Sequence, residues 1–203
     1  MHVTAAVLRE LEERFGIPEV AVGRMEFDAR EFDLVAGSHR HGRQHDVTLM
    51  IRDAEGRFAV IRKPSYPPEV FRPPSGGVEP GEAVEAGAAR EAREETGLEI
   101  RLERYLLRTE VEFSRGGSVL KWSTHLFLAR ATGGTLDPLD RREIAEARLA
   151  TVTEMVERYR PAMLAWGTMG MRYRVDLQDA ALRLLGLADP PPPPGGRTIV
   201  RIP

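Results

Sequence analysis

Residues 76–98 read GGVEPGEAVEAGAAREAREETGL, and no other stretch of the chain says as much about its fold and chemistry. A glycine-rich turn leads into a segment rich in alanine and glutamate, which predicts a helix because both residues favour that conformation. The helix ends on three glutamates, Glu91, Glu94 and Glu95. An α-helix turns by about 100° per residue, so these carboxylates share roughly 100° of its surface.

The crowding of these glutamates is electrostatically unfavourable. Glu91 and Glu95 stand in the i,i+4 relation, in which like charges repel. The C-terminal end of a helix also disfavours anions because of the helix dipole. A hard cation such as Mg²⁺ would relieve both effects, whereas the ordinary alternative is a solvated acidic helix face. Charge alone favours the solvated face.

The spacing of this stretch resembles the Nudix box, G-x5-E-x7-R-E-U-x-E-E-x-G-U, in which U is a bulky aliphatic residue. Ala92, at the first U, is the one departure because it is smaller than expected. The matching positions are Gly76, Glu82, Arg90, Glu91, Glu94, Glu95, Gly97 and Leu98. A motif of this length and fixed spacing favours metal binding over a solvated face.

The resemblance implies a fold class and an activity. The fold would be α+β, a Nudix-type α/β/α sandwich with a mixed β-sheet, extended by an N-terminal helix and a C-terminal helical segment. The activity would be that of a hydrolase of phosphoanhydride bonds with Mg²⁺ or Mn²⁺ as cofactor. We expect a pyrophosphohydrolase acting on a small nucleoside diphosphate derivative, with ADP-ribose or another NDP-sugar first and a nucleoside triphosphate second. The alternative is a sensor or scaffold that binds a nucleotide without cleaving it.

The resemblance also implies roles for the charged residues of the box. Glu91 and Glu95 are expected as direct metal ligands, and Glu94 as a ligand directly or through water. Arg90 is expected to hold these glutamates in place. Glu82 is expected to give structural support by hydrogen bonding the loop or a metal-bound water.

The general base varies within the family between a box glutamate and one from a later loop. Here the later loop corresponds to residues 140–148, where Glu146 is the first candidate and Glu143 the second. Two surface glutamates on a charged connector are an equally good interpretation of this segment.

Substrate contacts are expected on residues before and at the start of the box. Gly76 and Gly77 allow a phosphate or a metal to approach the backbone closely. Arg62 and Arg72 could supply positive charge to a pyrophosphate, although an ordinary surface arginine is the better interpretation of either one.

The hydrophobic pattern divides the chain into an N-terminal extension at 1–40, a catalytic core at 41–160, a helical segment at 161–189 and a proline-rich tail at 190–203. The extension is predicted to hold a helix at 4–15 and one or two strands at 19–37. The core is predicted to hold hairpins at 47–61 and 98–129 and a helix capped by Thr153. The tail is predicted to be extended, with either an edge strand at 198–200 or disorder.

Composition limits the classes of partner and of chemistry that can be expected of the chain. The net charge of −2 gives no reason to expect a nucleic-acid polymer or an anionic membrane as partner, and no apolar run approaches the length of a membrane span. The chain contains no cysteine, which excludes disulfides and thiol catalysis. We expect a cytoplasmic enzyme with a small-molecule nucleotide substrate, whose terminal extensions could support a homodimer. His39, His41 and His45 could form a second metal site, but solvent exposure or a phosphate contact is the better interpretation.

Overall fold

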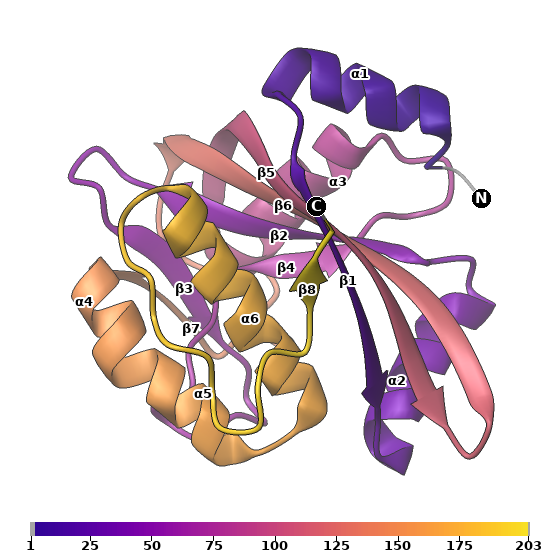
Figure 1. Ribbon diagram of the computed structural model, residues 1–203. Helices are drawn as coiled ribbons and strands as arrows, with labels where there is room; N and C mark the ends of the chain where they lie inside the picture. Colours follow the sequence, from indigo (N-terminus) through magenta and orange to yellow (C-terminus); the bar gives the residue numbers. More distant parts are fainter. Residues whose placement is uncertain (1–2, 203) are drawn as a thin grey trace.

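The computed structural model describes residues 3–202, which form a mixed β-sheet with helices on both faces (Figure 1). The strand order is β7-β3-β2-β6-β5-β1-β8, with β4 paired to β2. The strands are β1 Glu19–Glu26, β2 His45–Arg52, β3 Phe58–Arg62, β4 Ser75–Gly77, β5 Leu98–Arg115, β6 Ser118–Gly134, β7 Glu146–Ala150 and β8 Val200–Arg201. The helices are α1 Ala5–Phe15, α2 Ala29–Arg40, α3 Val84–Thr96, α4 Val152–Glu154, α5 Arg160–Trp166 and α6 Met169–Leu184, with a π-helical turn η1 at Met155–Tyr159.

A long antiparallel hairpin, β5 and β6, forms the centre of the sheet. On one side β1 runs parallel to β5, and on the other β2 runs parallel to β6. The sheet therefore combines parallel and antiparallel pairs, as expected from the α+β prediction. The predicted hairpins at 47–61 and 98–129 are confirmed by the pairing of β2 with β3 and of β5 with β6.

The two faces of the sheet carry separate hydrophobic cores, because side chains alternate along each strand. Val47, Leu49 and Ile51 of β2 point into the core that contains residues of α1 and α3. Met50 points into the opposite core, which α6 covers. The box helix and the C-terminal helices thus lie on opposite faces, as Figure 1 shows.

Two local predictions need correction. The segment after β1 is a helix, α2, and not a second strand, because Asp28 caps it by accepting a hydrogen bond from the Glu31 backbone N at 2.8 Å. The helix after β7 is capped by Thr151 and not by Thr153. Thr151 and Glu154 form a reciprocal capping box, which starts the helix two residues earlier than predicted.

The proline-rich tail lies against α5 and α6. Arg160 donates to the Pro191 carbonyl at 2.6 Å, and Arg172 donates to the Pro194 carbonyl at 2.7 Å. The tail then adds β8 antiparallel to the edge of β1. The edge-strand alternative is therefore the one that the structure shows.

No helix within residues 3–202 has the length and the hydropathy needed to cross a bilayer.

Candidate active site

The box helix α3 approaches the sheet closely because its inward residues are small. Ala88 and Ala92 are fully buried in the core that they share with β2. Gly87 instead lies against the loop before α3, where a Cβ would lie 2.9 Å from a carboxylate oxygen of Glu82. The small residue at the first aliphatic position of the motif therefore sits in a close helix–sheet contact. The helix ends at Gly97, whose φ of 77° is the left-handed C-cap that favours glycine.

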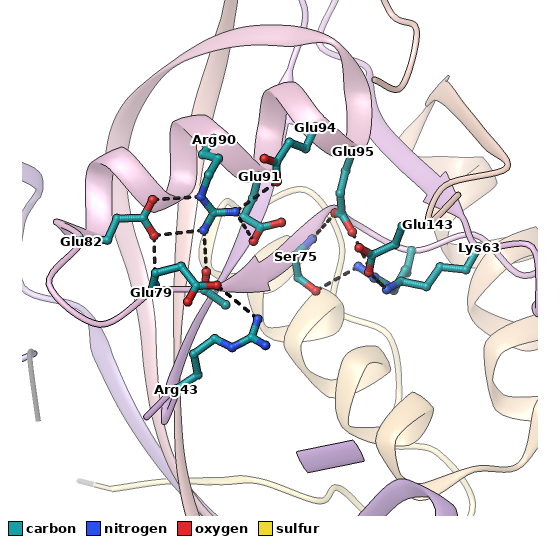
Figure 2. Close-up of polar contacts among 12 residues, drawn as sticks. Arg43, Lys63, Ser75, Glu79, Glu82, Arg90, Glu91, Glu94, Glu95 and Glu143 are labelled. Atoms are coloured by element: carbon teal, nitrogen blue, oxygen red, sulfur yellow. Dashed lines mark hydrogen bonds and ion pairs between the residues drawn. The ribbon is translucent and has the colours of Figure 1, made fainter. Parts of the chain in front are cut away.

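Arg90 is the centre of a partly buried polar network between α3 and the start of the box (Figure 2). Its guanidinium donates to Glu82 at 2.9 and 3.0 Å, to Glu91 at 2.8 Å and to Glu94 at 3.1 Å. It also donates to the Gly77 carbonyl at 2.8 Å. Arg90 and Glu82 thus connect the helix to the start of the box, which is the arrangement that a supporting role requires.

Glu91 is pressed against the backbone of Gly76. A Cβ at Gly76 would lie 1.9 Å from the carboxyl carbon of Glu91, so any larger residue there would displace the carboxylate. Burial raises the pKa of Glu91 to about 7, although the hydrogen bond from Arg90 acts in the opposite direction. The charges of Glu95 and Glu94 raise the pKa further. The positive charge of Arg90 is therefore not enough to offset the burial of the ionised Glu91 carboxylate.

Glu95 points away from Arg90 and toward the β4 backbone (Figure 2). It is 3% exposed and accepts a hydrogen bond from the Ser75 backbone N at 2.7 Å. Its other oxygen lies 3.5 Å from Nη2 of Arg72. Burial raises the pKa of Glu95, while Arg72 and Lys63 oppose that shift.

The donor chemistry of the three glutamates fits Mg²⁺ or Mn²⁺, which prefer carboxylate oxygens. Burial and the neighbouring carboxylates raise the pKa of Glu91 because they disfavour its ionised form. A bound cation would stabilise that ionised form. In the arrangement described, Glu91 and Glu94 face Arg90 while Glu95 faces Arg72. Accordingly, no group of three histidine or acidic side chains among residues 3–202 is gathered as a ready metal cage.

The loop that follows β6 is attached to the end of α3. The backbone N atoms of Leu139 and Asp140 both donate to the Glu94 carbonyl, at 3.0 and 3.1 Å. This attachment places Glu143 beside Glu95, and Glu143 forms an ion pair with Lys63 (Figure 2). The charge of Glu143 also contributes to the raised pKa of Glu95.

Glu146 has a different environment from Glu143. It lies on β7 directly opposite Arg62 of β3, and the two side chains approach to 3.4 Å. Arg148 also donates to Glu146, at 3.1 Å from its Nε. Glu146, the first-ranked candidate base, is thus paired with two arginines. Glu143, the second-ranked candidate, is paired with Lys63 and lies near the charge of Glu95.

The residues predicted to contact substrate are two glycines of the box and two arginines before it. Gly76 and Gly77 lie on β4, paired with Val47 and Asp46 of β2. Arg62 is half-buried and bound to Glu146, as described above.

Arg72 is not a surface arginine, because it is 1% exposed and faces the protein interior. It donates to the Tyr66 hydroxyl at 3.2 Å, to the Pro73 carbonyl at 2.8 Å and to the Ser75 hydroxyl at 2.9 Å. The Ser75 hydroxyl also accepts from Arg174 of α6, at 2.6 Å. The sequence analysis did not identify Arg174, since nothing local to α6 indicates that it reaches a residue 99 positions earlier.

The three predicted histidines do not converge. His45 is buried and its Nδ1 lies 3.0 Å from Nε2 of His125, whereas Nδ1 of His41 contacts the Gly37 carbonyl at 2.7 Å. His39 is part of α2 and not of a loop. The structure thus gives no support to a second metal site at these residues.

Known proteins resemble this chain in the same region. The NAD-capped RNA hydrolase NudC of Stutzerimonas stutzeri is 33% identical over 144 residues, which cover 71% of this chain and 46% of the relative. The NAD-capped RNA hydrolase NudC of Mycobacterium tuberculosis is 38% identical over 69 residues, which cover 34% of this chain and 22% of the relative. The chain therefore spans less than half the length of these curated relatives.

Among solved structures, a NUDIX hydrolase from Nitrosomonas europaea aligns with a TM-score of 0.49 and 18% identity, covering 68% of this chain and 89% of that chain. The family model of the NUDIX domain matches residues 42–167. This match includes the whole box, the strands β2 to β7 and the loop that carries Glu143. It spans more than half of the sequence, and the chain therefore belongs to the Nudix hydrolase family.

Proposed function

We propose that the protein is a metal-dependent pyrophosphohydrolase that cleaves the diphosphate linkage of a small nucleoside diphosphate derivative. The observation that carries this proposal is the placement of Glu91 against Gly76, with Glu94 and Glu95 on the same helix end. Glu91, Glu94 and Glu95 would hold Mg²⁺ or Mn²⁺ there. The bound ion would neutralise phosphate oxygens and lower the pKa of a coordinated water.

The protein residues supply positioning and proton transfer. Arg90 fixes the carboxylates of Glu91 and Glu94, and Glu82 fixes Arg90. We propose Glu143 as the general base that takes the proton from the attacking water, because it lies beside Glu95 and pairs with one lysine, whereas Glu146 is held by two arginines. General base catalysis requires such a group within hydrogen-bond reach of the water.

The substrate class is proposed from chemistry and from the relatives. Arg72 offers fixed positive charge beside Glu95, which suits a diphosphate. An NDP-sugar such as ADP-ribose stays the first candidate and a nucleoside triphosphate the second. The relatives named as NAD-capped RNA hydrolases add NAD and NAD-capped RNA to the compounds that need testing.

The experiment compares wild type with Glu91→Gln and with a matched control, Glu85→Gln, on a panel of these compounds with Mg²⁺ or Mn²⁺. Glu85 lies on the same helix but pairs with Arg14 at 2.9 Å, away from the box glutamates. We expect Glu91→Gln to lower kcat/KM by at least about 100-fold through loss of a metal ligand. Glu85→Gln should leave kcat/KM within about twofold of wild type.

A nucleotide-binding sensor is the competing function, and the same panel separates the two. Saturable binding of one compound without turnover of any would favour the sensor. Metal-independent turnover, or full activity of Glu91→Gln, would contradict the proposed mechanism.

A further inference from the structure

A row of polar side chains crosses the sheet face that α6 covers. Ser75 of β4 is paired with Thr48 of β2, and Asp46 of β2 is paired with Thr124 of β6, so these four side chains share one face. Tyr173 of α6 reaches the same row, since its hydroxyl donates to Thr124 at 2.8 Å. Helix–sheet contacts are normally apolar, so a polar row under a helix calls for a function.

Two guanidinium groups meet at the Ser75 hydroxyl in this row. Arg72 reaches it from the loop before β4 at 2.9 Å, and Arg174 reaches it from α6 at 2.6 Å. Two like charges on one neutral acceptor repel each other in a region of low dielectric. Glu95, which lies 3.5 Å from Nη2 of Arg72, offsets part of this repulsion, and a second anion near Arg174 would offset more of it.

Three buried polar atoms of this region have no hydrogen-bond partner. They are Oδ1 of Asp46, Oγ1 of Thr48 and Nη2 of Arg72, the last of which has an ion-pair contact with Glu95 at 3.5 Å but no hydrogen bond. Native proteins rarely leave such atoms unsatisfied, so their concentration near one place indicates an occupant. Arginine and threonine supply donors, and burial raises the pKa of Asp46, which favours the protonated form that can also donate. An acceptor-rich oxyanion matches this set.

We propose that Arg72 and Arg174 form an oxyanion-binding pair that holds phosphoryl oxygens of the substrate's diphosphate beside Ser75. The C-terminal helix α6 thus completes a site that the box alone leaves open. This inference rests on the proposed function and extends it to a residue outside the box. Ser75 links the two parts, because its backbone N donates to Glu95 while its hydroxyl accepts from both arginines.

Arg174 is the more accessible of the two arginines. Arg72 is almost fully buried, whereas Arg174 remains partly exposed. A ligand would therefore meet Arg174 first and displace its hydrogen bond to Ser75.

The test is calorimetric binding of methylenediphosphonate, whose P–C–P bridge is not hydrolysed, in buffer with EDTA. The proteins are wild type, Arg174→Met, Arg174→Lys and the control Arg183→Met. Arg183 lies on the same helix but pairs with Glu19 at 3.0 Å, away from Ser75. We expect Arg174→Met to weaken the Kd at least about tenfold and Arg174→Lys to have an intermediate effect, because charge-assisted hydrogen bonds to phosphate favour the arginine fork.

Arg183→Met should bind within about twofold of wild type. Wild-type affinity in Arg174→Met, or no binding by wild type, would overturn the inference. If Arg174→Met does not fold, the Kd of Arg174→Lys tests the inference instead, because this variant keeps the charge and is expected to bind less tightly than wild type. A purely structural arginine would lower the melting temperature without changing the Kd.

Turnover separates this inference from the proposed function. With an active substrate, Arg174→Met should raise KM more than it lowers kcat. Diphosphonate binding that depends on Arg174, without turnover of any compound, would instead contradict the proposed function alone.

Discussion

At the scale of single residues, the contact between Gly76 and Glu91 is the most sensitive point of the site. A Cβ at Gly76 would overlap the Glu91 carboxylate, which is the far end of a flexible side chain and can move away. We therefore expect Gly76→Ala to lower kcat at least about tenfold, with only a modest loss of melting temperature. Gly37→Ala on α2 is the control, since its Cβ would meet no atom closer than 3.9 Å. Steady-state kinetics and calorimetry on both variants would check this, and full activity of Gly76→Ala would contradict it.

His125 makes stability depend on pH. It is completely buried between His45 and the Tyr105 hydroxyl, and burial lowers its pKa to about 3. Between pH 6.5 and 3 the unfolded chain binds a proton at this residue that the folded protein excludes, so His125 lowers stability as pH falls. The loss approaches about 1.4 kcal/mol per pH unit.

Glu91 acts in the opposite sense over part of this range. Its pKa of about 7 means that the folded protein keeps a proton that the unfolded chain releases, which favours folding as pH falls. The informative measurement is thus the free energy of unfolding in urea of wild type minus that of His125→Gln, taken at several pH values between 7 and 5. We expect the difference to shrink as pH falls, and a constant difference would show that His125 does not titrate as described.

At the scale of elements, the C-terminal helices depend on one buried ion pair. Arg160 of α5 donates to both carboxylate oxygens of Asp179 of α6, at 2.9 and 3.1 Å, and Asp179 is fully buried. Arg160→Met would leave that carboxylate without its main partner, and we expect a loss of about 3–5 kcal/mol in urea unfolding. Arg158→Met, which removes an exposed pair with Glu69, should cost less than about 1 kcal/mol. Equal losses would contradict this assignment.

Elements with a strong local signal could be predicted from the sequence. The box helix and both hairpins follow from spacing and alternation. The second part of the N-terminal extension was predicted less well, because short apolar runs favoured strands. The sequence also contains a helix-start pattern there, Asp28 followed by Glu31 three residues later, which indicates the helix that the structure shows.

The candidate site could be predicted only where it is local in sequence. Glu91, Glu94 and Glu95 were identified because the box fixes their spacing, although their contacts with Arg90 and Arg72 required coordinates. The meeting of Arg174 with Ser75 depends on how α6 docks on the sheet. A contact between residues this far apart in sequence produces no local sequence pattern from which it could be predicted.

At the scale of the whole molecule, the tail closes one edge of the sheet. Residues 200 and 201 pair with Val22 and Ala21, and Ile199 is buried in the core under α6. We expect a chain ending at Leu187 to melt at a lower temperature and to associate, because the exposed edge of β1 offers unpaired backbone groups. Size-exclusion chromatography and calorimetry would measure both effects.

Val200→Thr is the matched control for the truncation. The Val200 side chain is exposed and its backbone pairing would be kept, so this variant should behave as wild type. An equally stable and monomeric truncated chain would show that the tail is dispensable for the fold.

The prolines of the tail are recognised through their carbonyl oxygens, which Arg160 and Arg172 bind at Pro191 and Pro194. Every amino acid carries that oxygen, so exchanging a side chain here leaves the acceptor in place. What proline adds is stiffness and the absence of a competing N–H. Residues 190–194 can therefore change in sequence as long as the segment stays extended, whereas a change at either arginine would remove one of the hydrogen bonds that hold the segment against α5 and α6.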